Sequence, residues 1–295
     1  MTTQKKIVVT GGSGKAGRAC VTDLLEHGYE VLVVDRVAPN PSRCASIVAD
    51  LTDFGQVIDA LSWPGGWSDL GGPCDVHAVV HLAAIPAPRL QPNAATFANN
   101  TLSDFNVFEA CRRLGIKHVV YASSETVLGL PFDEPPPYVP VDENYPPRPE
   151  SAYSLSKVVA ETMAQQFCRW DPELKMIGLR LSNVMAPQDY AQFPSFQDDA
   201  DIRKWNLWGY IDARDAAQAI RLSIESNLRG SEVFIIANAD TVMERKNGDL
   251  LKEKFPAGPQ RGEVGEHQTL LSIEKAKRLL GYSPKFDWRT ELQRR

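Results

Sequence analysis

Short apolar runs alternate with segments of helical spacing along the first two thirds of the chain. Six runs have the apolar, β-branched composition of strands: residues 6–10, 30–35, 46–50, 78–83, 118–123 and 176–182. Most are almost continuously apolar, whereas a strand with one face in water alternates between apolar and polar residues. We therefore expect strands buried on both faces, as in a parallel sheet covered by helices.

Helical patterns connect these runs. Apolar residues recur at three- and four-residue spacing over residues 16–28, 54–62, 96–115 and 154–170. Gly28 and Gly115 stand where two of these helices should end, because glycine readily adopts the left-handed conformation that closes a helix. The repeated order of strand, helix and strand predicts an α/β fold with a doubly wound parallel sheet.

The regular alternation weakens towards the end of the chain. Residues 130–151 carry eight prolines and cannot form a helix or a central strand, so we expect a stiff loop there. The polar, irregular stretch 196–205 is followed by a helical pattern at 209–226, an apolar run at 231–238 and a helical pattern at 272–282. The last third should therefore complete the sheet and add a small C-terminal lobe.

A glycine pattern lies between the first predicted strand and the first predicted helix. Gly11, Gly14 and Gly17 follow Thr10 at three-residue spacing. In a dinucleotide-binding Rossmann fold such glycines allow a tight turn, a close approach of backbone amides to a pyrophosphate, and close packing of the helix on the sheet. The free N–H groups at the start of the helix also favour phosphate. We therefore expect a bound dinucleotide.

Asp35 ends the second predicted strand, 18 residues after Gly17. A carboxylate there hydrogen-bonds the adenosine ribose and repels a 2′-phosphate, which favours NAD over NADP. Arg36 leaves NADP open, because a guanidinium next to the carboxylate can bind that phosphate. We expect an NAD-binding Rossmann domain over residues 1–180, completed by about 208–238. A small substrate-binding lobe would then consist of residues 181–207 and 239–295.

Composition excludes several classes of partner. The formal net charge of −5 over 295 residues gives no positive field for nucleic acid or an anionic membrane, and no apolar run approaches the roughly 18 residues that a membrane span needs. The five cysteines are scattered without a CxxC pattern, which is typical of free thiols in a reducing cytoplasm. His77 and His81 would lie ~13 Å apart along one strand, too far to share a metal ion. We expect a cytoplasmic protein that binds a small molecule and no metal.

Tyr153 and Lys157 are four residues apart at the start of a predicted helix and therefore share one face. A free phenol has a pKa of about 10, so a tyrosine acts as a base near neutral pH only where positive charge stabilises its phenolate. A neighbouring ammonium and a cationic nicotinamide ring both supply such charge. Ser124 stands at the end of the fifth strand, where its hydroxyl would orient a substrate oxygen beside Tyr153 while hydride leaves the carbon.

Together these residues resemble the extended short-chain dehydrogenase/reductases, the group of sugar-nucleotide epimerases and dehydratases. The resemblance covers nearly the full length and is highly specific in combination. Ser124, Tyr153 and Lys157 occupy the positions of the family's catalytic set. The matching segments are TGGSGKAG at 10–17, VVDR at 33–36, ADLTD at 49–53, HLAA at 81–84, NTLSDFNVFEAC at 100–111, YASSETVLG at 121–129, YSLSK at 153–157, RLSNVMAP at 180–187, YIDARDAAQAI at 210–220 and SIEKAKRLLGYSPKF at 272–286.

The resemblance also implies which residues contact the cofactor. Asp50 and Leu51 would flank the adenine, and Ser182 and Asn183 would lie beside the nicotinamide. The full cofactor-binding set that we expect is Gly11, Ser13, Gly14, Lys15, Ala16, Gly17, Asp35, Arg36, Asp50, Leu51, Leu82, Ala83, Ala84, Asn100, Ser123, Tyr153, Lys157, Leu181, Ser182 and Asn183.

Two departures from the family pattern narrow the reaction. Dehydratases carry an Asp-Glu pair directly after the catalytic hydroxyl, and the presence of Glu125 and Thr126 there disfavours dehydration. Epimerases use several dozen residues to build a nucleotide-diphosphate pocket ahead of the segment that here begins at Tyr210, and this chain has only the 22 residues 188–209. We therefore expect a smaller substrate, such as a free sugar, a sugar acid or another polyol.

The shortened segment resembles that of the uronate dehydrogenases, which oxidise the ring form of a hexuronate at C1 to a lactone. In that subfamily an arginine five residues before a tryptophan holds the substrate carboxylate. Arg203 stands five residues before Trp208, although a solvated surface arginine is the alternative. Ile85, Pro86 and Ala87 are apolar where the uronate enzymes carry polar groups, which favours a less hydroxylated substrate. The substrate-binding residues that we expect are Ile85, Ser124, Glu125, Thr126, Asn183 and Arg203.

Three functions stay open at this point. The first is an NAD-dependent dehydrogenase of carbohydrate metabolism that acts on a small sugar-like alcohol or lactol, of the uronate or aldose type and not a nucleotide sugar. The second is a sugar epimerase that retains its NAD. A non-catalytic NAD(P)-sensing module is disfavoured, because Tyr153 and Lys157 are both present. The resemblance further implies a homodimer through the helices near 100–113 and 154–168.

Overall fold

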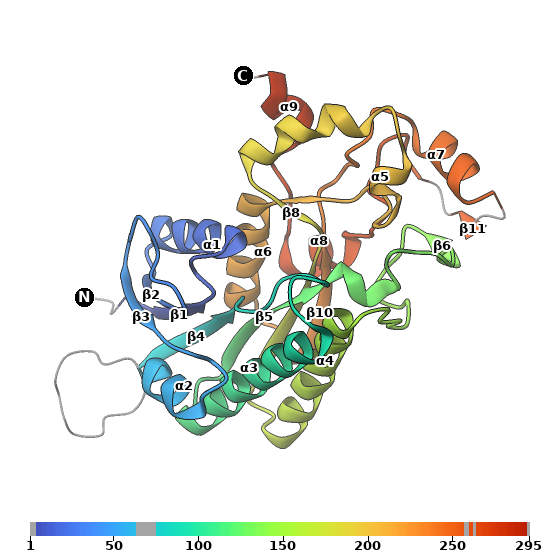
Figure 1. Ribbon diagram of the computed structural model, residues 1–295. Helices are drawn as coiled ribbons and strands as arrows, with labels where there is room; N and C mark the ends of the chain where they lie inside the picture. Colours follow the sequence, from blue (N-terminus) through green and yellow to red (C-terminus); the bar gives the residue numbers. More distant parts are fainter. Residues whose placement is uncertain (1–3, 63–74, 257–259, 262–263, 294–295) are drawn as a thin grey trace.

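Seven parallel strands form the centre of the computed structural model, which describes residues 4–62, 75–256, 260–261 and 264–293 (Figure 1). The six predicted strands and the run at 231–238 all lie in this sheet, with bounds within about two residues of those expected. The predicted doubly wound parallel sheet is therefore confirmed. Across the sheet the order is β10 (Gly230–Ile236), β7 (Lys175–Leu181), β5 (His118–Ser124), β4 (Val76–His81), β1 (Lys6–Thr10), β2 (Glu30–Asp35) and β3 (Ala45–Val48).

Helices cover both faces of the sheet (Figure 1). Val9 of β1 packs in the core on one face of the sheet, and its neighbour Val8 packs in the core on the other face. Both faces are dry, which is why the strands read as unbroken apolar runs. One face carries α1 (Lys15–Glu26) beside α6 (Ala213–Glu225), and the other carries α2 (Phe54–Leu61), α3 (Asn93–Leu114) and α4 (Ala152–Trp170).

The direction of winding reverses at the centre of the sheet. β2 and β3 follow β1 towards one edge, whereas β4, β5, β7 and β10 lead towards the other edge. The connections that leave β1 and β4 therefore separate at a topological switch point, where open α/β sheets bind their ligands. Thr10, His81 and Ser124 end β1, β4 and β5, so the loops after these residues border one crevice.

Shorter elements gather beyond the carboxyl ends of the strands, while α8 (Glu274–Leu280) packs on β10 and α6. The rings of Tyr190, Phe193, Tyr210 and Trp288 form an aromatic core there, with centroids 5.2 to 6.0 Å apart. The predicted division into two domains stays a prediction. The short elements are η1 (Glu125–Leu128), β6 (Tyr138–Val139), β8 (Val184–Met185), η2 (Pro187–Phe196), α5 (Asp201–Lys204), β9 (Ile211–Asp212), α7 (Asn247–Lys254), β11 (Gln260–Arg261) and α9 (Trp288–Gln293).

Among the helices that the structure describes, none combines the length and the apolar character needed to cross a lipid bilayer.

Candidate active site

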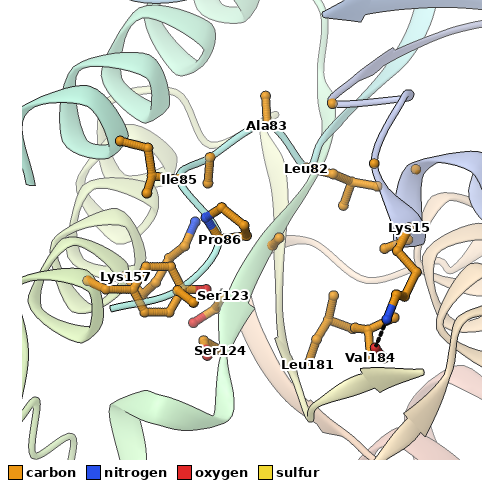
Figure 2. Close-up of a pocket in the computed structure, with 18 of the residues that line it drawn as sticks. Lys15, Leu82, Ala83, Ile85, Pro86, Ser123, Ser124, Lys157, Leu181 and Val184 are labelled. Atoms are coloured by element: carbon orange, nitrogen blue, oxygen red, sulfur yellow. Dashed lines mark hydrogen bonds between the residues drawn. The ribbon is translucent and has the colours of Figure 1, made fainter. Parts of the chain in front are cut away.

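A cavity of about 840 Å³ opens at the carboxyl ends of the central strands. Lys15 and Lys157 lie on opposite sides of it, and Ser123 and Ser124 lie near Lys157 (Figure 2). Most of the predicted site residues line this one cavity: Gly11, Ser13, Gly14, Lys15, Ala16, Gly17, Asp35, Arg36, Leu51, Leu82, Ala83, Ala84, Ile85, Ser123, Ser124, Glu125, Thr126, Tyr153, Lys157, Leu181, Ser182 and Asn183. Asp50, Asn100 and Arg203 are not among the lining residues.

The loop after β1 has the form of a phosphate cradle. Gly11 has a φ of +72°, and a Cβ there would lie 2.5 Å from the backbone nitrogen of Ala83. A Cβ on Gly17 would lie 2.1 Å from the carbonyl oxygen of Gly11, so only glycine allows α1 to approach the loop this closely. At Gly14 the nearest atom would be 3.3 Å away, and no side chain caps the helix that begins after this residue. The uncovered N–H groups therefore fit the diphosphate of a dinucleotide.

Asp35 lines the cavity beside the glycine loop. Its Oδ2 accepts a hydrogen bond of 3.0 Å from the backbone N–H of Ser13, so the carboxylate is fixed beside the glycine loop. Arg36 is paired with Asp50, its Nη2 lying 2.9 Å from Oδ1, and this bond together with two hydrogen bonds from Thr52 lowers the pKa of Asp50 to about 2. Asp50 therefore holds Arg36, while its neighbour Leu51 lines the cavity.

Ser124, Tyr153 and Lys157 converge on the same cavity from two elements. Ser124 ends β5, and Tyr153 and Lys157 lie in the first turns of α4, whose N-cap Ser151 accepts a 3.0 Å hydrogen bond from the backbone N–H of Ser154. All three side chains are at least nine-tenths buried. Nζ of Lys157 lies 6.0 Å from the centroid of the Tyr153 ring. This arrangement suits a tyrosine base beside a fixed positive charge.

A buried ion pair fixes the catalytic helix to the sheet. Arg180 of β7 donates to both carboxylate oxygens of Glu161 on α4, at 2.9 and 2.8 Å, and Ser123 donates to the same carboxylate at 2.6 Å. The hydroxyl of Ser123 is therefore used in this network, although the residue lines the cavity. Any contact of Ser123 with a cofactor would therefore be made by atoms other than this hydroxyl.

Asn100 acts through the loop that follows β4. Its Oδ1 accepts a 2.8 Å hydrogen bond from the N–H of Ile85, and its Nδ2 donates to the carbonyl of Ile85 at 3.1 Å. The side chain is thus bound to the backbone of Ile85, so we place it as support for the cavity wall. Asn99 and Ser103, on the same helix, line the cavity instead.

A family model described as the NAD dependent epimerase/dehydratase family matches residues 7–237. The chain belongs to this family. Its members are extended short-chain dehydrogenase/reductases, so the predicted resemblance is confirmed, and the cofactor is NAD. The glycine cradle and Asp35 are consistent with that cofactor.

Relatives within the epimerase/dehydratase family cover almost the whole chain. UDP-glucose 4-epimerase from Streptococcus mutans is 27% identical over 95% of this chain and 92% of its own length. The solved structure of UDP-glucose 4-epimerase from Thermotoga maritima with UDP-glucose has a TM-score of 0.71 and 24% identity, and covers 98% of this chain and 96% of that one. A mutated uronate dehydrogenase has a TM-score of 0.67 and 22% identity, covering 99% of this chain and 86% of that one. These two structures share the fold with this chain.

Arg203 is buried and is not among the described residues that line the cavity. Its side chain is 5% exposed, and Nη2 donates to the carbonyl of Gly209 at 2.7 Å. Asn206 donates to the same carbonyl at 2.9 Å. Leu207 and Trp208, which lie between Asn206 and Gly209 in the sequence, have positive φ values of 54° and 57°. Arg203 therefore stabilises a strained turn and does not meet a substrate carboxylate in this conformation.

Glu125 is the charged residue that reaches the cavity next to Ser124. Only 3% of it is exposed, and its carboxylate accepts hydrogen bonds from Ser182 at 2.5 Å and from Asn206 at 3.1 Å. Burial raises the pKa of Glu125 to about 7, against the lowering effect of these hydrogen bonds and of the Arg203 charge. Burial therefore moves the titration of this carboxyl from the acid range towards neutral pH.

Sequence reasoning missed two residues near the cavity. Trp205 lines the cavity, whereas Trp208, from which the position of Arg203 was counted, is fully buried and donates to the carbonyl of Ala200. Asp189 binds Nζ of Lys15 at 2.5 Å, and Lys15 also donates to the carbonyl of Val184 at 3.2 Å (Figure 2). No motif marks these residues, because both lie in the irregular segment after β7.

Proposed function

We propose that the protein is an NAD-dependent dehydrogenase that oxidises the carbinol carbon of a small, uncharged sugar-like alcohol or lactol. Ser124, Tyr153 and Lys157 on one cavity wall support an oxidoreductase within the epimerase/dehydratase family. The shape and charge of the other wall support a small substrate.

The roles of the side chains follow from their positions. NAD, when bound along the glycine loop, supplies the hydride acceptor. Ser124 donates a hydrogen bond to the substrate oxygen, and Tyr153 takes the proton from that hydroxyl. Lys157 is one helical turn away, so its ammonium stabilises negative charge on the Tyr153 oxygen.

The observation that carries the proposal is the charge pattern around the substrate end of the cavity. Among the described lining residues the cations are Lys15, Arg36 and Lys157. Lys15 is bound to Asp189, and Arg36 is bound to Asp50. Only Lys157 then faces the substrate end, where Glu125 adds an opposing carboxyl. A nucleotide diphosphate or a uronate would bring negative charge to a site where, among the described lining residues, Lys157 is the remaining cation and its charge already serves the Tyr153 oxygen.

The segment that would build a nucleotide pocket is also short. It has the 22 residues 188–209, and three of its large side chains, Tyr190, Phe193 and Trp208, are fully buried and are not among the residues that line the cavity. Ile85, together with the prolines and alanine that follow it, gives the cavity an apolar stretch of wall. These features favour a compact substrate that combines a reacting hydroxyl with an apolar face.

A sugar epimerase that retains its NAD is the second candidate function. It is favoured by the curated relatives, since UDP-glucose 4-epimerases from Streptococcus mutans and Corynebacterium glutamicum are 27% and 25% identical over at least nine-tenths of their length. In such an enzyme the hydride taken from the substrate returns to it, so no free NADH forms.

One experiment separates the two functions. Purified protein is incubated with NAD and, in turn, neutral aldoses and polyols, their uronates, and UDP-sugars, and NADH is followed at 340 nm. Stoichiometric NADH with a neutral sugar supports the dehydrogenase. Interconversion of UDP-glucose and UDP-galactose without NADH, together with nucleotide that copurifies with the protein, would establish the epimerase instead.

We also propose a homodimer through α3 and α4. A groove of about 230 Å³ lies between these helices and is lined mostly by apolar residues, with Phe105 41% and Trp170 55% exposed. Large apolar side chains that are exposed together in one groove are typical of a contact between subunits.

A further inference from the structure

Glu125 occupies an unusual place for a carboxyl group. It follows Ser124 directly, begins the short helix η1, and lines the cavity that Ser124 and Tyr153 also line. The residue is 3% exposed. A buried carboxyl group normally has a cationic partner, because removing an isolated charge from water costs several kcal/mol.

The described residues give Glu125 hydrogen bonds but no ion pair. Ser182 and Asn206 donate to its two oxygens at 2.5 and 3.1 Å, and the backbone N–H of Asn183 also donates to it. Arg203 is the nearby cation, yet its Nη2 donates to the carbonyl of Gly209. Arg203 therefore acts on the carboxylate only as a more distant charge.

These contacts leave the carboxylate able to bind a further donor. A carboxylate offers about four lone-pair positions, and the protein supplies three donors. Because Glu125 lines the same cavity as Ser124, we assign the remaining capacity to a substrate bound at Ser124. A buried carboxyl that has hydrogen-bond donors but forms no ion pair is a candidate for a functional role.

We propose, on the basis of the proposed dehydrogenase function, that the ionised carboxylate of Glu125 accepts a hydrogen bond from a second hydroxyl of the substrate. The same charge excludes compounds that carry a carboxylate or phosphate at that position. The preferred substrate class is therefore a neutral polyhydroxy compound, and Glu125 positions it for reaction at the carbon beside Ser124.

The proposal has a pH consequence, because the pKa of Glu125 is raised to about 7 by burial. Protonation turns the acceptor into a donor, so KM for a neutral substrate should rise as the pH falls from 8 to 6. Tyr153 and Lys157 of α4 line the same cavity, and the charge of Arg203 on α5 lowers the pKa of the Glu125 carboxyl. The wild-type profile alone therefore does not assign the titration to Glu125.

The test compares wild type with Glu125→Gln and Glu125→Asp in the presence of NAD. The probes are glucose with glucuronate and galactose with galacturonate, measured at pH 6, 7 and 8. For Glu125→Gln we expect KM for the neutral sugar to rise at least tenfold at pH 8, kcat to change less than about threefold, and the dependence of KM on pH to disappear. Glu125→Asp keeps a carboxylate and should retain part of the affinity and the pH dependence.

Asp215→Asn is the matched control. Asp215 is a buried carboxyl on α6 whose pKa is raised to about 6 by burial, and it does not line the cavity. This variant should leave KM and its pH dependence unchanged. An unchanged KM and pH profile in Glu125→Gln, or a wild-type enzyme that prefers the uronates, would overturn the proposal.

Thermal shifts of the NAD-loaded protein with the same sugars separate the two levels of inference. If the neutral sugars stabilise wild type, and do so less after Glu125→Gln, while no NADH forms, the dehydrogenase function fails and the role of Glu125 stands. If NADH forms from the neutral sugars but Glu125→Gln behaves as wild type, the function stands and the role of Glu125 fails. No thermal shift and no NADH with any probe overturns both.

Discussion

Nζ of Lys157 lies 6.0 Å from the centroid of the Tyr153 ring, one turn further along α4. We expect Tyr153→Phe to lower kcat by roughly 10²–10⁴-fold, because the phenol is the group that accepts the proton. NAD affinity, measured by fluorescence titration, should change less than about threefold, since the ring and the helix are retained.

Tyr121→Phe is the control for that substitution. Tyr121 lies on β5 and is fully buried, and its hydroxyl has no hydrogen-bond partner among the residues that the structure describes, so its loss should leave kcat unchanged. An unchanged kcat in Tyr153→Phe would show that Tyr153 is not the group that accepts the proton.

The fold could be predicted because its signals are local and repeated. Strands such as β1 are buried on both faces, so each one reads as an apolar run. The glycine loop could be predicted as well, because the positions of Gly11 and Gly17 leave no room for a side chain. The three proposed catalytic residues meet in one cavity because one strand end and one helical turn bring them together.

Side-chain direction could not be predicted in the same way. The spacing of Arg203 and Trp208 suggested a substrate contact, but the turn with positive φ at Leu207 and Trp208 directs Arg203 to the carbonyl of Gly209. Asn100 was likewise expected at the cofactor and instead binds the backbone of Ile85. These outcomes depend on loop conformation, which residue spacing does not specify.

Gly14 and Gly17 should respond differently to alanine. At Gly17 the Cβ would lie 2.1 Å from the Gly11 carbonyl oxygen, so Gly17→Ala should destabilise the fold and lower Tm. At Gly14 the nearest atom would be 3.3 Å away, so Gly14→Ala should fold but lose at least tenfold in NAD affinity, since its methyl group stands in the phosphate cradle. Thermal melts and NAD titrations of both variants measure this; equal NAD affinity in Gly14→Ala and wild type would contradict the cradle.

The charge of Asp35 should decide between NAD and NADP. Because the carboxylate repels a 2′-phosphate, the wild type should prefer NAD at least tenfold in kcat/KM. Asp35→Asn removes the repulsion of the 2′-phosphate and should raise kcat/KM for NADP. Adding Arg36→Met should reverse that gain, because Arg36 is the cation that can bind the phosphate. A wild-type preference for NADP would show that Arg36 leaves Asp50, to which it is bound at 2.9 Å.

His118 should make the fold sensitive to acid. Burial lowers its pKa to about 4, with a further contribution from the Lys175 charge, and its ring packs on His77 with centroids 5.0 Å apart. Between pH 6.5 and 4 the unfolded chain binds a proton that the folded chain refuses, so the free energy of unfolding falls as the pH falls. Urea unfolding at pH 7.5 and 5 should show a smaller loss in His118→Gln; an equal loss in both proteins would assign the acid sensitivity to other groups.

The groove between α3 and α4 should control the oligomeric state. Phe105 and Trp170 expose 41% and 55% of their surface in it, so an aspartate at Phe105 would place a charge in the centre of the proposed contact. Light scattering after gel filtration should show a wild-type dimer and a monomeric Phe105→Asp. Leu279→Asp is the matched control, because Leu279 is 39% exposed on α8, away from the groove, and its substitution should leave the dimer intact. A monomeric wild type, or a Phe105→Asp protein that stays dimeric, would place the contact elsewhere or remove it.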